Sequence, residues 1–297
     1  MSLVRDLFTD YTLRNVALGS VVLGIVSGVL GCFAVLRRQG LMGDALAHAA
    51  LPGVCLAYMI TGSKSSLTLI IGAGIAGWIG MLAILAIGRR TKIDQGSALG
   101  IVLTVFFGLG VVLLTVIQKG NDPNQAGLDK FLFGQAAALT AEHVTTMSTI
   151  GGIGLLFVAL LFKEFKVLSF DPEFAGTIGL PVASLGKLLT GLLVLAIVIG
   201  LNTVGVILMS AMLVAPASAA RQWTHSLGRM VLYSAVIGSA SGLTGAIWSV
   251  LVPGIPTGPA IVICLGIAVA VSLILGSAQG LAWQSRRRKA RRLEDPA

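Results

Sequence analysis

The chain has 297 residues, of which 56% are hydrophobic and only 11% are charged, and its mean hydropathy is +0.94. Soluble domains carry about 25% charged residues, so this composition excludes a soluble globular protein and indicates a polytopic membrane protein. The net charge of +9 does not indicate nucleic-acid binding, because the cations lie in short loops between apolar segments and in a basic tail at residues 286–297.

Nine windows meet or approach the roughly 20 apolar residues that a membrane-crossing helix needs. In chain order they are Val16–Leu36, Leu41–Ile60, Leu67–Ile87, Ser97–Ile117, Val144–Phe162, Leu185–Ile199, Val204–Ala220, Met230–Leu251 and Ala260–Leu275. Residues 1–15 lack a small-residue cleavage site, so we expect them to lead into the first span rather than to form a signal peptide. We predict one all-α domain over residues 1–297 with about nine spans, or eight if one short segment is re-entrant.

The second window carries a carboxylate, Asp44, and an imidazole, His48. They are the only carboxylate and the only histidine within a predicted span. On a helix their spacing places both side chains on one face, with Cβ atoms about 5–6 Å apart. Ionisable groups inside a membrane span are costly and usually mark a pathway or a bound ion. An oxygen ligand beside a nitrogen ligand suits a divalent first-row metal, so we predict that this pair contacts a transported metal ion.

Structural roles for the pair are also open. Asp44 could cap a helix that starts at Gly43, and His48 could bond a neighbouring carbonyl. Two ligands do not complete a metal site, so water, a backbone carbonyl freed by a helix break at Pro52 and Gly53, or a partner subunit would supply the rest. The pair lies only a turn or two past Arg37-Arg38. Either the helix starts deep, with the arginines at the rim of a recess, or the first two spans have the opposite orientation.

Lys and Arg residues indicate the topology. If spans alternate in direction, most cationic side chains fall on one side of the membrane. This side receives Arg37, Arg38, Arg89, Arg90, Lys92, Lys163, Lys166, Lys187, Arg221, Arg229 and the tail from Arg286. The other side receives Lys64, Lys119 and Lys130. By the positive-inside rule we expect the C-terminus in the cytoplasm.

A short capped helix is predicted at about 171–180, between two spans. Asp171 can cap the first amides, Pro172 fits the first helical position, and Glu173 favours the positive end of the helix. Gly179 and Pro181 are typical of a helix end. Such a helix is too short to be stable alone, so it either docks a cytoplasmic partner or lies at the membrane surface without one.

The remaining polar candidates favour ordinary surface roles. Glu142-His143 lies at the external start of a span, where it could attract cations, but a solvated loop is expected. His225 is expected on a cytoplasmic surface. Asp94 lies beside Arg89, Arg90 and Lys92, where it could form ion pairs near an inner gate, but ordinary loop electrostatics are expected. No residue is predicted to be catalytic.

Several motifs together resemble the integral membrane permeases of ATP-binding-cassette importers for manganese, zinc and iron. They occur in family order over residues 16–280 and are Gly43–Ala49 with Leu51-Pro52-Gly53, Gly100–Val102, Phe131–Gly134, Asp171–Leu180, Leu213–Ala217 and Pro256–Pro259. The Gly-Asp-x-x-x-His element with its Leu-Pro-Gly is quite specific, whereas the other motifs are weak alone.

The resemblance implies a permease in the cell (plasma or inner) membrane with no permanently bound cofactor. Two such subunits, alike or different, form the pathway, two ATPase subunits bind beneath them, and an external solute-binding protein delivers the metal. The residues that the resemblance assigns to ATPase coupling are Asp171, Pro172, Glu173, Phe174, Gly176 and Gly179. The chain has no GxxxxGK[ST] motif, so it is not expected to hydrolyse ATP itself.

Two rival classes remain at this point. A proton-coupled secondary metal transporter would use Asp44 and His48 as a relay, but such carriers usually repeat their site in a second half. An intramembrane metalloenzyme would need more ligating or reacting groups. Among metals, the lack of a thiolate beside the pair favours manganese or iron over zinc, and residues 126–135 look most like manganese-type members.

Overall fold

The computed structural model describes residues 11–63, 65–119, 139–201, 205–252, 255–278 and 280, and all regular structure within them is helical. In chain order the helices are α2 (Tyr11–Leu36), α3 (Gly40–Thr61), α4 (Ser66–Arg90), α5 (Gln95–Lys119), α7 (Ala141–Leu160), α8 (Phe162–Phe170), α9 (Pro172–Thr177), α10 (Val182–Leu201), α11 (Val206–Arg221), α12 (Leu227–Leu251) and α13 (Thr257–Leu275). The predicted piece Phe131–Gly134 and the basic tail 286–297 lie outside the described residues.

Eight of the described helices are long and apolar enough to cross a membrane, namely all except α8, α9 and α11. The predicted window Val204–Ala220 corresponds to α11, whose 16 residues reach about 24 Å, less than the roughly 30 Å of a hydrocarbon core. The prediction of an all-α membrane protein with eight or nine spans is therefore confirmed, and α11 is the short segment that left the count open.

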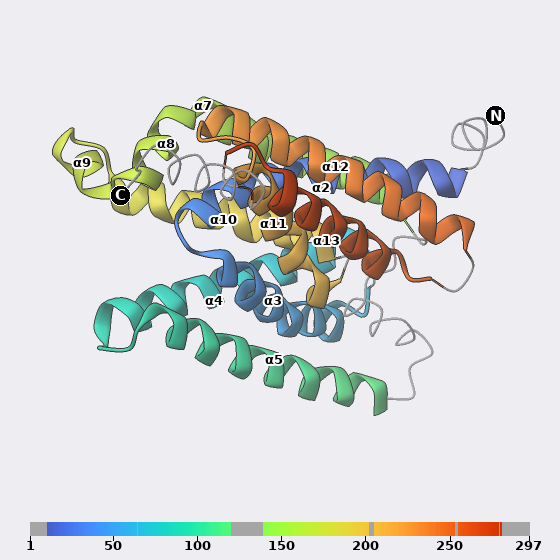
Figure 1. Cartoon of the computed structure of the whole chain (residues 1–297). Helices are drawn as coiled ribbons and strands as arrows, with labels where there is room; N and C mark the ends of the chain where they lie inside the picture. The colour runs from blue at the N-terminus through green and yellow to red at the C-terminus, as the bar shows by residue number, and fades with distance from the viewer. Residues whose placement is uncertain are drawn as a thin grey trace, which may run out of the picture.

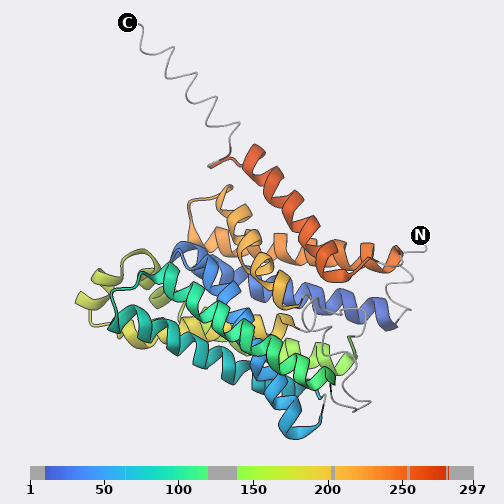
Figure 2. The same ribbon diagram turned by 90° about the horizontal axis from the view of Figure 1, so that it is seen from below.

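The bundle is organised around α2 and α3, which are the most buried of the long helices. Figure 1 shows α4 and α5 along one side of α3, and α2, α12 and α13 on the other side. Seen from below, α13 lies at the edge of the bundle against α11 and α12 (Figure 2). Both α3 and α11 therefore run through the middle of the molecule, between the two groups of helices.

Small residues let α2 and α12 pack backbone to backbone. A Cβ atom on Gly24 would overlap the backbone of Gly238, and the Ser234 hydroxyl donates a 2.7 Å hydrogen bond to the carbonyl of Gly28. The antiparallel seam consists of Ser20, Gly24 and Gly28 facing Gly242, Gly238 and Ser234. Packing through small residues is the usual way to associate helices in lipid, where the hydrophobic effect does not drive them together.

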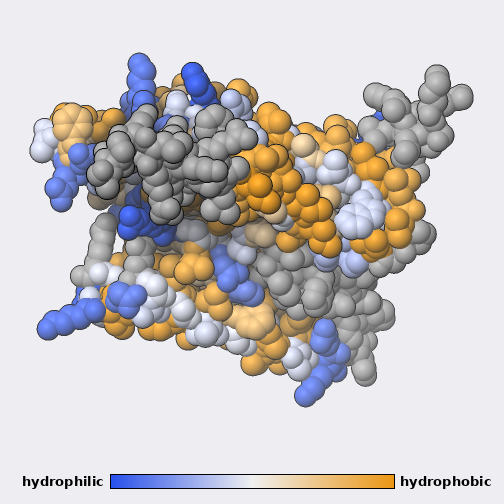
Figure 3. Space-filling view, viewed as in Figure 1, coloured by the Kyte–Doolittle hydropathy of each residue, from blue (hydrophilic) through white to orange (hydrophobic). Residues whose placement is uncertain are grey.

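One end of the bundle carries the loops rich in cations. The α8 helix docks there on the end of α2, where the Phe33 ring contacts the rings of Phe162 and Phe165 at centroid distances of 6.3 and 5.9 Å. The end of α13 lies there too, because the Ala278 N–H donates to the Gln222 carbonyl after α11. Figure 3 shows hydrophilic side chains gathered chiefly at this left-hand end, and apolar side chains along the flanks of the long helices.

Candidate functional site

The α3 helix starts before the predicted acid–histidine pair. A tight turn after α2 includes Arg38 in the left-handed region, with φ 57°, and the helix begins at Gly40 after Gln39, whose side chain makes no capping hydrogen bond. Asp44 lies more than a turn into the helix, where the backbone amides are already paired. A role for Asp44 as the helix cap is therefore excluded.

Asp44 and His48 lie together on one face of α3. The Nε2 atom of His48 is 3.6 Å from the Oδ1 atom of Asp44, and the side chains are 13% and 35% exposed, respectively. This separation exceeds the usual hydrogen-bond range. The two groups therefore lie close together without forming a hydrogen bond to each other.

The imidazole of His48 is fixed by packing rather than by a hydrogen bond. Its ring meets the ring of Phe107 on α5 edge to face, with centroids 4.8 Å apart and an interplanar angle of 77°. Its Nδ1 atom is buried and has no hydrogen-bond partner among the described residues, so His48 does not bond a neighbouring carbonyl there. Nε2 is the ring atom directed toward Asp44, and it is free to bind a ligand.

Glycines bring α11 close to the Asp44 turn of α3. A Cβ atom on Gly40 would lie 3.4 Å from Cγ2 of Val214, and one on Gly43 would lie 2.9 Å from Cδ2 of Leu213 and 3.9 Å from Cα of Ser210. Larger residues at these positions would push the helices apart. The sequence Gly-Leu-Met-Gly-Asp thus places the Asp44 carboxylate directly beside α11.

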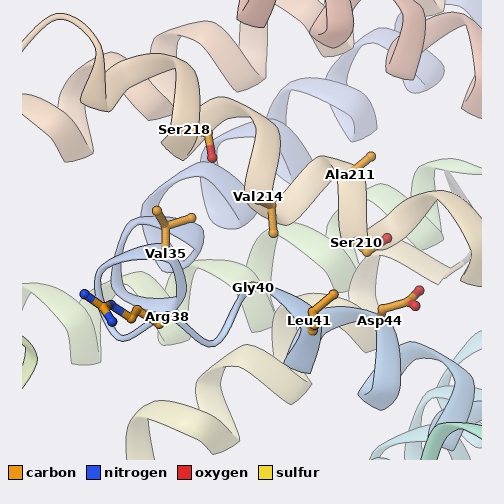
Figure 4. Close-up of a pocket in the computed structure, with 9 residues that line it drawn as sticks. All are labelled: Val35, Arg38, Gly40, Leu41, Asp44, Ser210, Ala211, Val214 and Ser218. Carbon is orange, nitrogen blue, oxygen red and sulfur yellow. The ribbon is translucent and has the colours of Figure 1, made fainter. Parts of the chain in front are cut away.

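A cavity of about 520 Å³ lies between the two helices. It is lined by Val35, Arg38, Gly40, Leu41, Asp44, Ser210, Ala211, Val214 and Ser218. Figure 4 shows Asp44 and Ser210 at one end of the cavity and Arg38 at the other, with Leu41 between them. The sequence offered a recess beside Arg37-Arg38 as one of two explanations for the position of the pair. The structure has such a recess, with Arg38 at one end and Asp44 at the other.

The site offers one carboxylate and one imidazole from this chain. The part of the chain that the structure describes contains no group of three or more His, Cys, Asp or Glu side chains that could hold a metal ion. None of the described cysteines lines the cavity. Two hard or borderline ligands beside an open space suit a divalent cation that keeps part of its hydration shell.

The helix break predicted at Pro52 and Gly53 is wrong. The α3 helix continues through both residues to Thr61. Gly53 is the point of closest approach to α4, because a Cβ atom there would overlap the backbone of Gly72, and this packing holds the helix together around the proline. Pro52 still lacks an N–H group, so the carbonyl of His48, four residues earlier, loses its helical donor.

The short helix after α8 forms at Pro172–Thr177. The Asp171 carboxylate accepts a 2.9 Å hydrogen bond from the N–H of Phe174, and Pro172 occupies the first turn. Gly179 has φ +83°, a left-handed conformation that ends the helix at little cost for glycine. The backbone around Gly176 leaves open space where a side chain would be.

Large apolar side chains are exposed on this helix and directly beside it, at the end of the bundle. Phe170, Phe174 and Ile178 are 58%, 52% and 52% exposed, whereas Ala175 is fully buried. Exposed aromatic residues on a capped helix beyond the membrane spans are typical of a surface for protein contact.

His143 has a structural role that the sequence pattern did not predict. Nδ1 of His143 accepts hydrogen bonds from the N–H and hydroxyl of Thr140 at 3.3 and 2.8 Å, and the Thr140 hydroxyl oxygen accepts the N–H of His143. This reciprocal capping box starts α7. The signal was the Thr-x-x-His spacing, in which histidine takes the place usually held by Glu or Gln.

Asp94 and His225 lie in the loops between spans, and the structure gives each a specific local environment. Asp94 accepts hydrogen bonds from the hydroxyl and N–H of Ser97 at 2.6 and 3.0 Å, and these bonds lower the pKa of Asp94. It therefore caps α5, and within the described residues it forms no ion pair with Arg90 or Lys92. His225 is exposed and lines a cavity of about 180 Å³ together with Arg221 and Phe170.

Comparison with known proteins places this architecture in a family. The model of the ABC 3 transport family matches residues 9–276. A zinc transport system membrane protein, TroC of Treponema pallidum (strain Nichols), is 46% identical over 290 residues, which cover 97% of each chain. A manganese transport system membrane protein, MntC of Bacillus subtilis (strain 168), is 47% identical over 264 residues, which cover 89% of this chain and 61% of MntC.

A solved structure agrees with the sequence comparisons. PsaBC from Streptococcus pneumoniae in complex with Fab is similar at a TM-score of 0.83 and 30% identity, over 97% of this chain and 99% of that chain. The resemblance seen in the motifs is confirmed, and these relatives are membrane components of transport systems rather than enzymes. The chain is a multi-pass membrane protein that belongs to the ABC 3 transport family.

Proposed function

We propose that the chain is the permease subunit of an ATP-driven importer and that it conducts a divalent metal ion past Asp44 and His48. The observation that carries this proposal is the pair itself. The Asp44 carboxylate lines a cavity and lies 3.6 Å from the His48 imidazole, whose Nδ1 atom has no partner among the described residues. Polar groups buried in a span without partners are costly, and passage of a cation explains why they are there.

An incomplete site suits transport, since a conducting site must also release its ion. Asp44 supplies a charged oxygen and His48 a neutral nitrogen, and both must be deprotonated to bind a metal. Water and a second permease subunit complete the coordination in this proposal. The exposure of Leu41, which is 70% and lies one turn from Asp44, supports a neighbour on this face of α3.

Manganese is our first choice of substrate, followed by zinc or iron. Relatives with nearly equal identity are named for zinc and for manganese, so similarity alone does not decide. A cavity lined by the Asp44 carboxylate and by no described cysteine favours Mn²⁺ over softer ions.

The end of the bundle with α8 and α9 is cytoplasmic in this proposal. The cation-rich loops lie at that end, as the positive-inside rule requires, and α13 also ends there. The exposed face of Phe170, Phe174 and Ile178 then docks on an ATPase subunit, with Asp171, Pro172, Glu173, Gly176 and Gly179 shaping the contact. An external solute-binding protein delivers the metal at the opposite end.

Docking can be tested by copurification of the ATPase subunit. Phe174→Ala should reduce the amount of ATPase that copurifies with the permease, because it removes the centre of the exposed face. Phe157→Ala is the matched control, since Phe157 is also exposed, at 43%, but lies on the flank of α7. Equal copurification with both variants would contradict this docking surface.

Transport by the complete complex in sealed vesicles separates the importer from its rival, a proton-coupled carrier that uses Asp44 and His48 as a relay. The importer takes up Mn²⁺ only with ATP, the ATPase subunits and the binding protein. The carrier takes up Mn²⁺ with a proton gradient alone. Uptake driven by the gradient without ATP would overturn the importer.

A further inference from the structure

The side of α11 that faces Asp44 carries two hydroxyl groups without a hydrogen-bond partner in the described part of the chain. Ser210 and Ser218 line the cavity from the same helix, two turns apart, and both are half-buried. Neither hydroxyl makes a hydrogen bond to any described residue. Figure 4 shows Ser210 across from Asp44, and Ser218 near the Arg38 end.

Other helical hydroxyls of this chain behave differently. Thr104 and Thr190 each donate a 2.9 Å hydrogen bond to the carbonyl four residues earlier, and Ser169 does so at 2.7 Å. This local bond is the usual way to satisfy a hydroxyl inside a helix. Ser20 and Ser27 also lack partners, but they are fully buried in packed helix contacts and face no cavity.

The position of Ser210 is fixed by helix packing. Its Cα atom lies 3.9 Å from the place that a Cβ of Gly43 would take, and Gly43 directly precedes Asp44. A free hydroxyl is therefore held beside the carboxylate, on the opposite wall of the same cavity. Half-burial leaves it accessible to an ion and its water shell.

We propose that Ser210 is a specificity-determining residue of the metal pathway, whose hydroxyl oxygen joins Asp44 and His48 around the passing ion. This inference rests on the function proposed above. A neutral oxygen donor is a hard ligand, of the class that suits Mn²⁺ better than thiophilic ions such as Cd²⁺. The hydroxyl binds the ion directly or through one of its waters, and it raises the oxygen share of the site without adding charge.

The test uses the complete transporter in vesicles with Mn²⁺ as substrate and Cd²⁺ as competitor. Ser210→Ala should raise the Mn²⁺ concentration for half-maximal uptake about threefold to tenfold, the worth of one lost hydrogen bond or ligand. Ser210→Cys should make uptake about tenfold more sensitive to inhibition by Cd²⁺, because a thiolate prefers soft metals. Ser218→Ala and Ser218→Cys are the matched controls and should behave as the wild type does.

A second readout does not depend on transport. Cd²⁺ added to the purified Ser210→Cys complex should produce the ultraviolet absorption of a cadmium–thiolate bond, above the background of Cys32, Cys55 and Cys264 that every variant shares. Wild-type half-saturation and Cd²⁺ sensitivity in both Ser210 variants would overturn the assignment. Equal effects of the Ser218 substitutions would overturn it too, because the effect would not be local to Asp44. Normal uptake by Asp44→Ala would instead overturn the proposed function.

Discussion

The chain carries two acid–histidine pairs, and their surroundings differ in one respect that matters for function. At the start of α7, His143 is fully engaged by Thr140, with its ring and its backbone amide both hydrogen-bonded. Inside α3, His48 has a buried Nδ1 atom without a partner among the described residues, and its Nε2 atom points toward Asp44. His143 of the first pair completes a helix end together with Thr140, whereas His48 of the second pair has a ring nitrogen without a hydrogen-bond partner among the described residues.

The difference shows how hydrogen-bond accounting separates structural polar groups from functional ones. A capping box satisfies amides that the helix cannot pair internally. An unpaired imidazole within a membrane span is not explained by such a cap, and the passage of a cation is the explanation that we propose. Residue types alone do not distinguish the two pairs.

The largest expected effect comes from removing the free pair. Asp44→Asn or His48→Gln should lower Mn²⁺ uptake by more than about tenfold, because each removes a ligand from a site that has few. Glu142→Gln and His143→Gln should leave the uptake per folded transporter near the wild-type value. Mn²⁺ uptake by vesicles with equal amounts of reconstituted complex measures the effect of each substitution. Equal losses of uptake in the two pairs would contradict the functional difference between them.

A moderate effect on stability is expected at the capping box. Thr140→Ala removes the hydroxyl that contacts both the ring and the amide of His143, and it should lower the free energy of unfolding by about 1 kcal/mol. Thermal unfolding of the purified protein in detergent should shift downward by a few degrees, while Mn²⁺ affinity stays unchanged. An unchanged melting temperature would show that the capping box does not stabilise α7.

The smallest effect is expected at Asp94, which is a cap and not part of a charged site. Asp94→Ala should lower the melting temperature slightly, and Asp94→Asn less so, because asparagine also caps helices. The pKa of Asp94 lies below its ordinary value of 3.8, so its stabilisation is present above that pH. It is lost as the pH falls through the lowered pKa. Melting curves of wild type and Asp94→Ala should therefore differ at pH 6 and converge in acid, and a difference that persists in acid would contradict this role.

Much of the architecture could be predicted from the sequence, because the membrane imposes a simple length and hydropathy requirement. The spans and the pair on one face of α3 follow from periodicity. The helix after Asp171 was expected from its cap and proline, and the structure has a helix at Pro172–Thr177. These features depend on residues close together in the chain.

Features that depend on contacts between distant segments were missed or misjudged. Pro52 and Gly53 indicated a helix break, but packing of Gly53 against Gly72 on α4 keeps α3 continuous. The position of Ser210 beside Asp44 depends on how α11 packs on Gly43, which no local pattern shows. Two local features were missed as well, the caps formed by Asp94 with Ser97 and by Thr140 with His143, because each cap is recognised only once the helix start is known.

The central claim is that metal passes the Asp44–His48 pair, and pulsed electron paramagnetic resonance of Mn²⁺ bound to the complete complex tests it most directly. The account predicts a hyperfine coupling from an imidazole nitrogen that is present in the wild type and in His143→Gln but lost in His48→Gln. A nitrogen coupling that persists unchanged in His48→Gln, or that disappears only in His143→Gln, would contradict it.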